Sequence, residues 1–88
     1  MSSRRSKFQI SVEVLTAISH GEHRPTRLMY ECNLSWVSIK NTLALLESKG
    51  YVDDLSEEQK RKHYSITAKG REVLGYYLGL QDLVEVSM

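Results

Sequence analysis

Apolar residues recur at helical spacing through the first part of the chain. Ser6 and Gln9 have the spacing of a capping box, which predicts that a first helix begins there. His20-Gly21 is predicted to end it. The apolar stripe of this helix consists of Ile10, Val14, Leu15 and Ile18.

A second, short helix is predicted after a turn. Pro25 pushes Arg24 towards an extended conformation, so the turn runs from Gly21 to Pro25. We expect Thr26 to cap the helix and Asn33 to end it in a left-handed conformation. Its apolar residues are Leu28, Met29 and Cys32.

The stretch from Leu34 to Gly50 predicts a longer third helix, with Ser35 as its N-cap and Gly50 just past its end. Leu34 and Ile39 have the spacing of a hydrophobic staple. The stripe expected to be buried is Ile39, Leu43 and Leu46, with Trp36 at its edge. The opposite stripe is small and polar and comprises Val37, Asn41, Ala44 and Ser48, flanked by Ser38 and Lys40.

The periodicity changes after Gly50. Tyr51-Val52 and the segment 62–67 have strand composition, and Tyr64 and Ile66 are predicted to share one face. The polar link between them predicts a hairpin with a wide tip. Thr67 is then expected to cap a last helix that runs to about Val84.

The predicted fold is mainly α with a small β-hairpin: a winged helix-turn-helix with a three-helix core, a wing and a C-terminal helix. We expect one domain over residues 1–88, with a flexible basic arm at 1–6 and the C-terminal helix at 67–85.

The last helix has an apolar band wider than a monomer needs. We therefore expect part of it to be covered by a second copy of the chain, although it can instead fold back over the first helix. Leu74 and Leu78 widen the band, and Gly75 and Gly79 weaken the helix. The residues predicted to form the homodimer are Val73, Tyr76, Tyr77, Leu80, Leu83 and Val84.

Charge is unevenly distributed. Residues 1–71 hold all 12 lysines and arginines against eight acids, a balance of +4, whereas residues 72–88 hold three acids and no base, a balance of −3. The basic part can face a polyanion. The lone Cys32 suits a reducing cytoplasm, no secretory signal is recognisable, and no apolar run reaches the ~20 residues of a membrane span.

Two sequence blocks add to the order of elements, the first of them specific and the second common to many winged helices. The first joins Thr26-Arg27-Leu28-Met29-Tyr30 to Asn33-Leu34-Ser35-Trp36, and the second is Ile66-Thr67-Ala68-Lys69-Gly70. With RRSKFQISVEVLTAISHG they give the chain a resemblance, over nearly its whole length, to a family of small archaeal winged-helix proteins. The resemblance implies DNA binding without catalysis, by transcriptional regulators or chromatin-type proteins, and a homodimer joined through the C-terminal helix.

The third helix is the best candidate for reading DNA. Asn41, Lys40 and Ser38 are suited to base edges, and Val37 or Ala44 to a thymine methyl group. An ordinary solvated face is the alternative. The predicted DNA-binding residues of this helix are Ser35, Trp36, Val37, Ser38, Lys40, Asn41 and Ala44.

Other cations are predicted to contact phosphate. Arg4, Arg5 and Lys7 can grip the backbone or simply form a solubilising end. Arg27 and Thr26 lie where the second helix begins. The wing would contribute Lys60, Arg61, Lys62 and His63, unless Asp53, Asp54, Glu57 and Glu58 pair with them across the hairpin.

We expect no metal, cofactor or small-molecule ligand. His20, His23, Cys32 and His63 lack the spacing of a zinc site, and no catalytic constellation is recognisable. The sequence thus predicts a homodimer that binds double-stranded DNA. A winged-helix scaffold for protein–protein interaction is the alternative.

Overall fold

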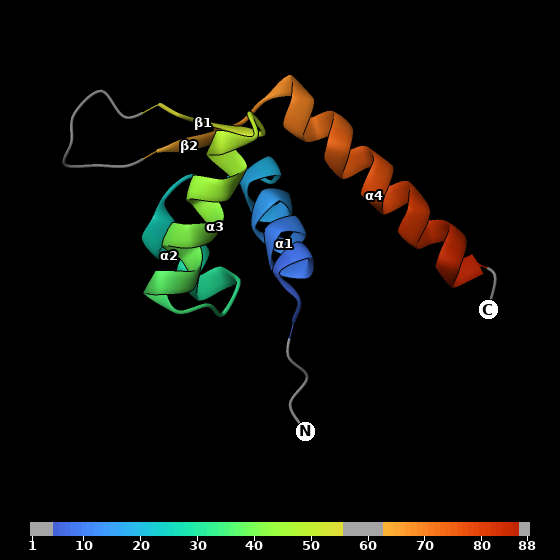
Figure 1. The fold of residues 1–88 in the computed structure, drawn as a ribbon, viewed down its shortest axis with the longest axis horizontal. Coiled ribbons are helices and arrows are strands. Elements are labelled where there is room, and N and C mark those ends of the chain that lie inside the picture. The colour runs from blue at the N-terminus through green and yellow to red at the C-terminus, as the bar shows by residue number, and fades with distance from the viewer. Residues whose placement is uncertain (1–4, 56–62, 87–88) are drawn as a thin grey trace.

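The computed structural model describes the backbone of residues 5–55 and 63–86, and the side chains of residues 5–55 and 63–80. The elements are α1 (Lys7–Ser19), α2 (Pro25–Glu31), α3 (Trp36–Ser48), β1 (Val52–Asp54), β2 (Tyr64–Ile66) and α4 (Ala68–Val86). Figure 1 shows α1, α2 and α3 clustered together, with the hairpin at one edge and α4 running away from the cluster. The predicted order and fold class are confirmed.

The core lies where α1 meets the other helices. Val14, Leu28 and Ile39, one from each of the first three helices, are completely buried, and Val52 of β1 joins them. Burying a side chain of this size stabilises a fold by roughly 1.5–3 kcal/mol. The predicted stripes of α1 and α3 therefore form the core, although Ile10 is only partly buried at its margin.

Each of the first three helices ends with a left-handed residue. These residues are Gly21 (φ 109°), Asn33 (φ 57°) and Gly50 (φ 78°). The residue that follows each of them donates its backbone N–H to a carbonyl of the preceding helix. Leu34 N donates to Met29 O at 2.9 Å, and Tyr51 N donates to Leu46 O at 2.9 Å. This is the Schellman arrangement, in which a left-handed residue lets orphaned carbonyls find donors. The predicted stops at Asn33 and Gly50 are confirmed.

Hydroxyl groups cap three of the four helices. Ser6 accepts from Gln9 N at 3.0 Å, Ser35 from Ser38 N at 3.1 Å, and Thr67 from Gly70 N at 2.9 Å. Each supplies an acceptor to an N–H that the helix itself leaves unpaired.

The predicted cap at Thr26 is wrong. Arg24 occupies the N-cap position of α2 in an extended conformation, with φ −96° and ψ 134°, and makes no side-chain cap bond. Pro25 is the first helical residue, because its fixed φ suits that position and it has no N–H to lose. Thr26 consequently lies inside the first turn.

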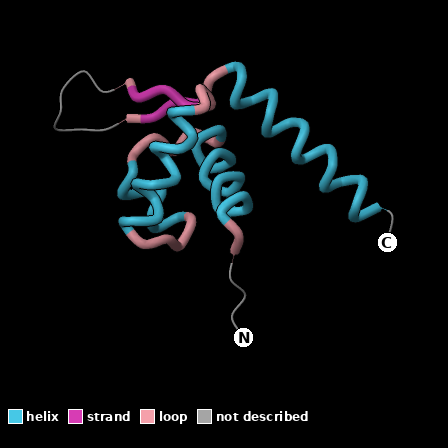
Figure 2. The backbone as a smooth tube through the Cα atoms, in the orientation of Figure 1, coloured by secondary structure: helices cyan, strands magenta, loops and turns pink. Residues whose placement is uncertain are grey.

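The hairpin is short and antiparallel, as Figure 2 shows. Val52 pairs with Ile66, and Asp54 pairs with Tyr64. His23 attaches the turn after α1 to β2: its carbonyl accepts from Tyr64 N at 3.0 Å, and its Nδ1 lies 2.9 Å from Tyr64 O. Tyr64 is buried and Ile66 packs against the core, so the two lie on the same face, as predicted. The tip at 56–62 lies outside the described residues.

The first turns of α4 are anchored to the domain. Leu74 is buried, Val73 packs against the core, and Tyr77 meets Phe8 of α1 edge to face with ring centroids 5.2 Å apart. Beyond them the helix leaves the cluster (Figure 1), and Tyr76 and Leu80 are 71% and 62% exposed. Only the beginning of α4 therefore folds over α1. No described helix combines the length and apolarity needed to cross a membrane.

Gly70 lies where α4 packs closely against Tyr51, the residue that precedes β1. A Cβ at this position would lie 2.2 Å from Tyr51 O and 2.9 Å from Ile66 Cγ1. Nothing lies within 4 Å of the corresponding position at Gly75. Gly70 is therefore required by packing, and Gly75 is not.

We expect Gly70→Ala to lower the free energy of unfolding by about 1–3 kcal/mol, because backbone must shift to admit the methyl group. Gly75→Ala is the matched control and should be neutral or stabilising by up to about 1 kcal/mol, through helix propensity. Urea denaturation of both variants tests this. A Gly70→Ala protein as stable as its Gly75→Ala counterpart would contradict the packing argument.

Candidate nucleic-acid interface

The side of α3 that faces away from the core is open and has small side chains. Lys40, Asn41 and Ala44 are exposed, and Val37 is 66% exposed. Ser38 is partly buried, next to the boundary with the core. Trp36 is 46% exposed, so it is half buried as expected. The structure thus places Val37, Lys40, Asn41 and Ala44 on the solvent-exposed side of α3, with Trp36 and Ser38 at its edges.

The opposite side of α3 fixes its orientation. Ile39, Leu43 and Leu46 are at most 3% exposed and pack into the core shared with α1 and α2. Thr42 is buried among them, although its polar hydroxyl did not mark it for the core. Rotation of α3 would expose this apolar stripe, so the fold holds the opposite stripe towards solvent.

Ser35 caps the start of α3. Its Oγ accepts the N–H of Ser38, which satisfies one orphaned donor of α3. A hydroxyl that accepts one bond can still donate its own proton, so the cap leaves Ser35 able to donate to a phosphate or a base.

The start of α2 presents a second candidate contact. The Arg27 side chain is 71% exposed, and its Nε lies 3.7 Å from Glu22 Oε1. Exposed ion pairs of this kind are worth little, so Glu22 does not prevent Arg27 from meeting an anion. Thr26 is exposed beside it.

Arg5 is not the free cation that the flexible-arm expectation describes. Its guanidinium pairs with Glu13, and it donates to Cys32 O at 2.8 Å and Asn33 O at 2.9 Å. These contacts bridge 8, 27 and 28 positions of sequence, which local pattern cannot reveal. The predicted phosphate grip by Arg5 is therefore replaced by a tertiary contact, and Arg4 lies outside the described residues.

Of the predicted wing contacts, only His63 can be placed. It is exposed, and its ring meets that of His23 edge to face at 5.3 Å between centroids. Its carbonyl accepts from Leu55 N at 2.7 Å. Lys60, Arg61 and Lys62 lie outside the described residues, as do Glu57 and Glu58.

The fold brings Lys7 next to the open face of α3. A groove of about 360 Å³ separates the beginning of α1 from α3, and its lining includes Lys7, Ser11, Ser38 and Asn41. The sequence placed Lys7 with the N-terminal cations but gave no sign of its proximity to Asn41. The groove therefore adds a cation beside the open face of α3.

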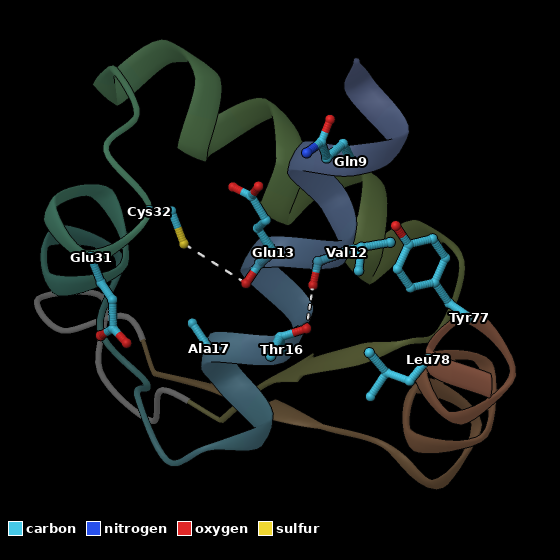
Figure 3. Close-up of a pocket in the computed structure, with 9 residues that line it drawn as sticks. All are labelled: Gln9, Val12, Glu13, Thr16, Ala17, Glu31, Cys32, Tyr77 and Leu78. Atoms are coloured by element: carbon cyan, nitrogen blue, oxygen red, sulfur yellow. Dashed lines mark hydrogen bonds between the residues drawn. The ribbon is translucent and has the colours of Figure 1, made fainter. Parts of the chain in front are cut away.

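A separate hollow of about 450 Å³ lies beside α1, away from this face. Figure 3 shows Cys32 on one side of it and Tyr77 and Leu78 of α4 on the other. Burial raises the pKa of the Cys32 thiol, and the nearby charges of Glu13 and Glu31 raise it further, although Arg5 opposes them. A buried thiol that keeps its proton is a packing residue rather than a nucleophile. The described residues contain no group of three or more potential metal ligands.

Residues 4–85 match the family model described as winged helix-turn-helix. An uncharacterized protein of Methanocaldococcus jannaschii is 29% identical to this chain over 83 residues. The match covers 94% of this chain and 77% of the length of that protein. Among solved structures, the transcriptional regulator BldR of Sulfolobus solfataricus has a TM-score of 0.77 and 26% identity, covering 89% of this chain and 58% of its own. Sso10a-2, a DNA-binding protein of Sulfolobus solfataricus, has a TM-score of 0.72 and 22% identity. The match covers 94% of this chain and 88% of the Sso10a-2 chain.

We expect Ser35→Ala to cost about 1 kcal/mol of stability, because the N–H of Ser38 loses its partner. Ser48→Ala, at the other end of the same helix, removes an exposed hydroxyl that only bonds back to Leu45 O, and should change stability by less than about 0.5 kcal/mol. Thermal unfolding measures both. Equal losses of stability in the two variants would mean that the Ser35 cap does not stabilise α3.

Proposed function

Because this chain belongs to the winged helix-turn-helix family, we propose that it binds double-stranded DNA through the open face of α3. The observation that carries this proposal is the exposure of Lys40, Asn41 and Ala44 on a helix whose other side is locked into the core. A major groove admits such a helix when no bulky side chain blocks its approach.

In this proposal α3 lies in the major groove and its N-terminal half meets the base edges. Asn41 is suited to a bidentate contact with adenine, and Lys40 to the acceptors of guanine. Val37 and Ala44 are suited to the methyl group of thymine. Ser38 and the indole N–H of Trp36 would add a contact each, to a base edge or a phosphate.

Backbone contacts would surround the helix. Arg27 and Thr26 lie at the start of α2, Ser35 at the cap of α3, and Lys7 across the groove from Asn41. His63, with Lys60, Arg61 and Lys62 of the wing, would reach the flanking phosphates or minor groove. Phosphate contacts should make the affinity fall with salt.

The biological role that fits best is that of a local transcriptional regulator or a minor chromatin protein. BldR is a transcriptional regulator and Sso10a-2 is a DNA-binding protein, and the similarity of this chain to both supports this role. The net charge of only +1 favours a binder that depends on contacts from α3 over one that coats DNA by charge alone.

We further propose that two chains form a homodimer through α4. Tyr76 and Leu80 are exposed on the part of the helix that leaves the domain, and they line a shallow hollow of about 580 Å³ with Glu72, Gly75 and Gly79. Val73 is partly buried against the core of its own chain, and Tyr77 contacts Phe8. Leu83 and Val84 continue the sequence pattern beyond the described side chains. The two copies of α3 would reach successive major grooves ~34 Å apart.

The DNA proposal is tested with duplexes selected from a random library by the wild-type protein. Asn41→Ala should lose roughly 1–3 kcal/mol of preference for selected over shuffled duplex, because a base contact is removed. Arg27→Ala should lower the slope of log affinity against log salt by about 0.9, because it removes a proposed phosphate contact. Arg71→Ala, an exposed cation on α4, is the control and should change neither quantity.

Wild-type binding that is absent, or that does not vary with salt, would contradict the DNA proposal and favour the scaffold for protein–protein interaction. An Asn41→Ala protein that keeps the full preference for selected duplex would exclude base reading by Asn41.

The dimer is tested by measuring mass in solution. Leu80→Asp places a charge in the proposed interface, so it should shift the protein from twice the chain mass towards one chain mass. Leu55→Asp is the control, because Leu55 is 57% exposed but lies outside α4. A wild-type monomer, or a Leu80→Asp dimer as stable as wild type, would contradict an interface on this face.

A further inference from the structure

Arg5 joins three parts of the chain. It precedes α1, it pairs with Glu13 in the middle of α1, and it reaches the turn between α2 and α3. Nη1 donates to both Glu13 Oε1 and Cys32 O, and Nη2 donates to Asn33 O. The planar fork of a guanidinium fits such a set of acceptors, which a single ammonium cannot match in geometry.

The carbonyls that Arg5 contacts lie where α2 ends. The N–H groups of Asn33 and Leu34 donate back to Tyr30 O and Met29 O, at 3.2 and 2.9 Å. Arg5 provides donors for two further carbonyls of this turn, those of Cys32 and Asn33. A cation is also favourable at this place, because a helix carries partial negative charge at its C-terminus.

The same turn leads directly into α3. Asn33 is left-handed, and only Leu34 separates it from Ser35, the cap of α3. The direction in which α3 begins is therefore set by the turn that Arg5 holds. Glu13 fixes the other end of the contact to α1, the helix against which α3 packs.

We propose that Arg5 is a positioning residue of the DNA-binding surface, holding the α2–α3 turn against α1 so that the start of α3 keeps one orientation. This inference rests on the proposed function of α3. Arg5 itself does not contact phosphate: its charge is paired with Glu13, and its side chain is only 28% exposed. To reach DNA it would have to release contacts with three partners.

The first test needs no DNA. Amide hydrogen exchange is compared in wild type, Arg5→Ala, Arg5→Lys and the control Arg71→Ala. Without the guanidinium fork, exchange at Leu34 and Ser38 should rise roughly tenfold relative to the core amides of Val14 and Leu15. Arg5→Lys should also show the rise, because it keeps the charge but not the fork. An equal rise at all four amides, or none, would overturn the positioning role.

The second test measures affinity for the selected duplex against salt. Positioning predicts that Arg5→Ala and Arg5→Lys both weaken binding with no change in slope. A phosphate contact predicts that Arg5→Ala lowers the slope by about 0.9 while Arg5→Lys binds like wild type, and that result would overturn the proposal. If Arg5→Ala does not fold, Arg5→Lys decides both tests. If wild type binds no duplex, the DNA proposal fails, and exchange alone still shows whether Arg5 holds the turn.

Discussion

The packing of α3 against α1 is the constraint on which the rest of the molecule depends. Ile39 and Leu43 of α3 meet Val14 and Leu15 of α1 in a core where none of the four is more than 3% exposed. Burying these side chains stabilises the fold far more than any surface contact does. Because α3 cannot turn without exposing them, the small polar stripe on its far side must face outwards. The candidate interface is thus a consequence of the core.

The ends of the elements make this arrangement rigid. Left-handed residues stop α1, α2 and α3, and hydroxyl groups cap α1, α3 and α4. Thr67 also donates to Gly50 O at 2.7 Å, which fastens the start of α4 to the end of α3. In the turns that join the helices, the carbonyls of Cys32, Asn33 and Gly50 accept hydrogen bonds from side chains. Such a frame can present a helix to DNA with little reorganisation, since its orientation is already fixed.

Patterns that act over a few residues could be predicted from the sequence. Periodicity identified the buried stripe of α3, and the spacing of Ser35 and Gly50 identified its ends, because helix formation and capping are local. Thr26 was placed wrongly as a cap because the preference of Pro25 for the first helical position prevailed. Three features depend on how distant segments meet. They are the contacts of Arg5, the place of Lys7 beside Asn41, and the division of α4 between Leu74 in the core and Tyr76 outside it. Composition and periodicity carry no information on which segments distant in sequence contact one another.

The most direct test of the account is to map where a DNA duplex touches the protein, by following backbone amide NMR signals during a titration. The account predicts that the largest changes fall in the first half of α3 and at the start of α2, with the outer face of α4 unchanged. Changes centred on Tyr76 and Leu80, with none around Lys40 and Asn41, would contradict it.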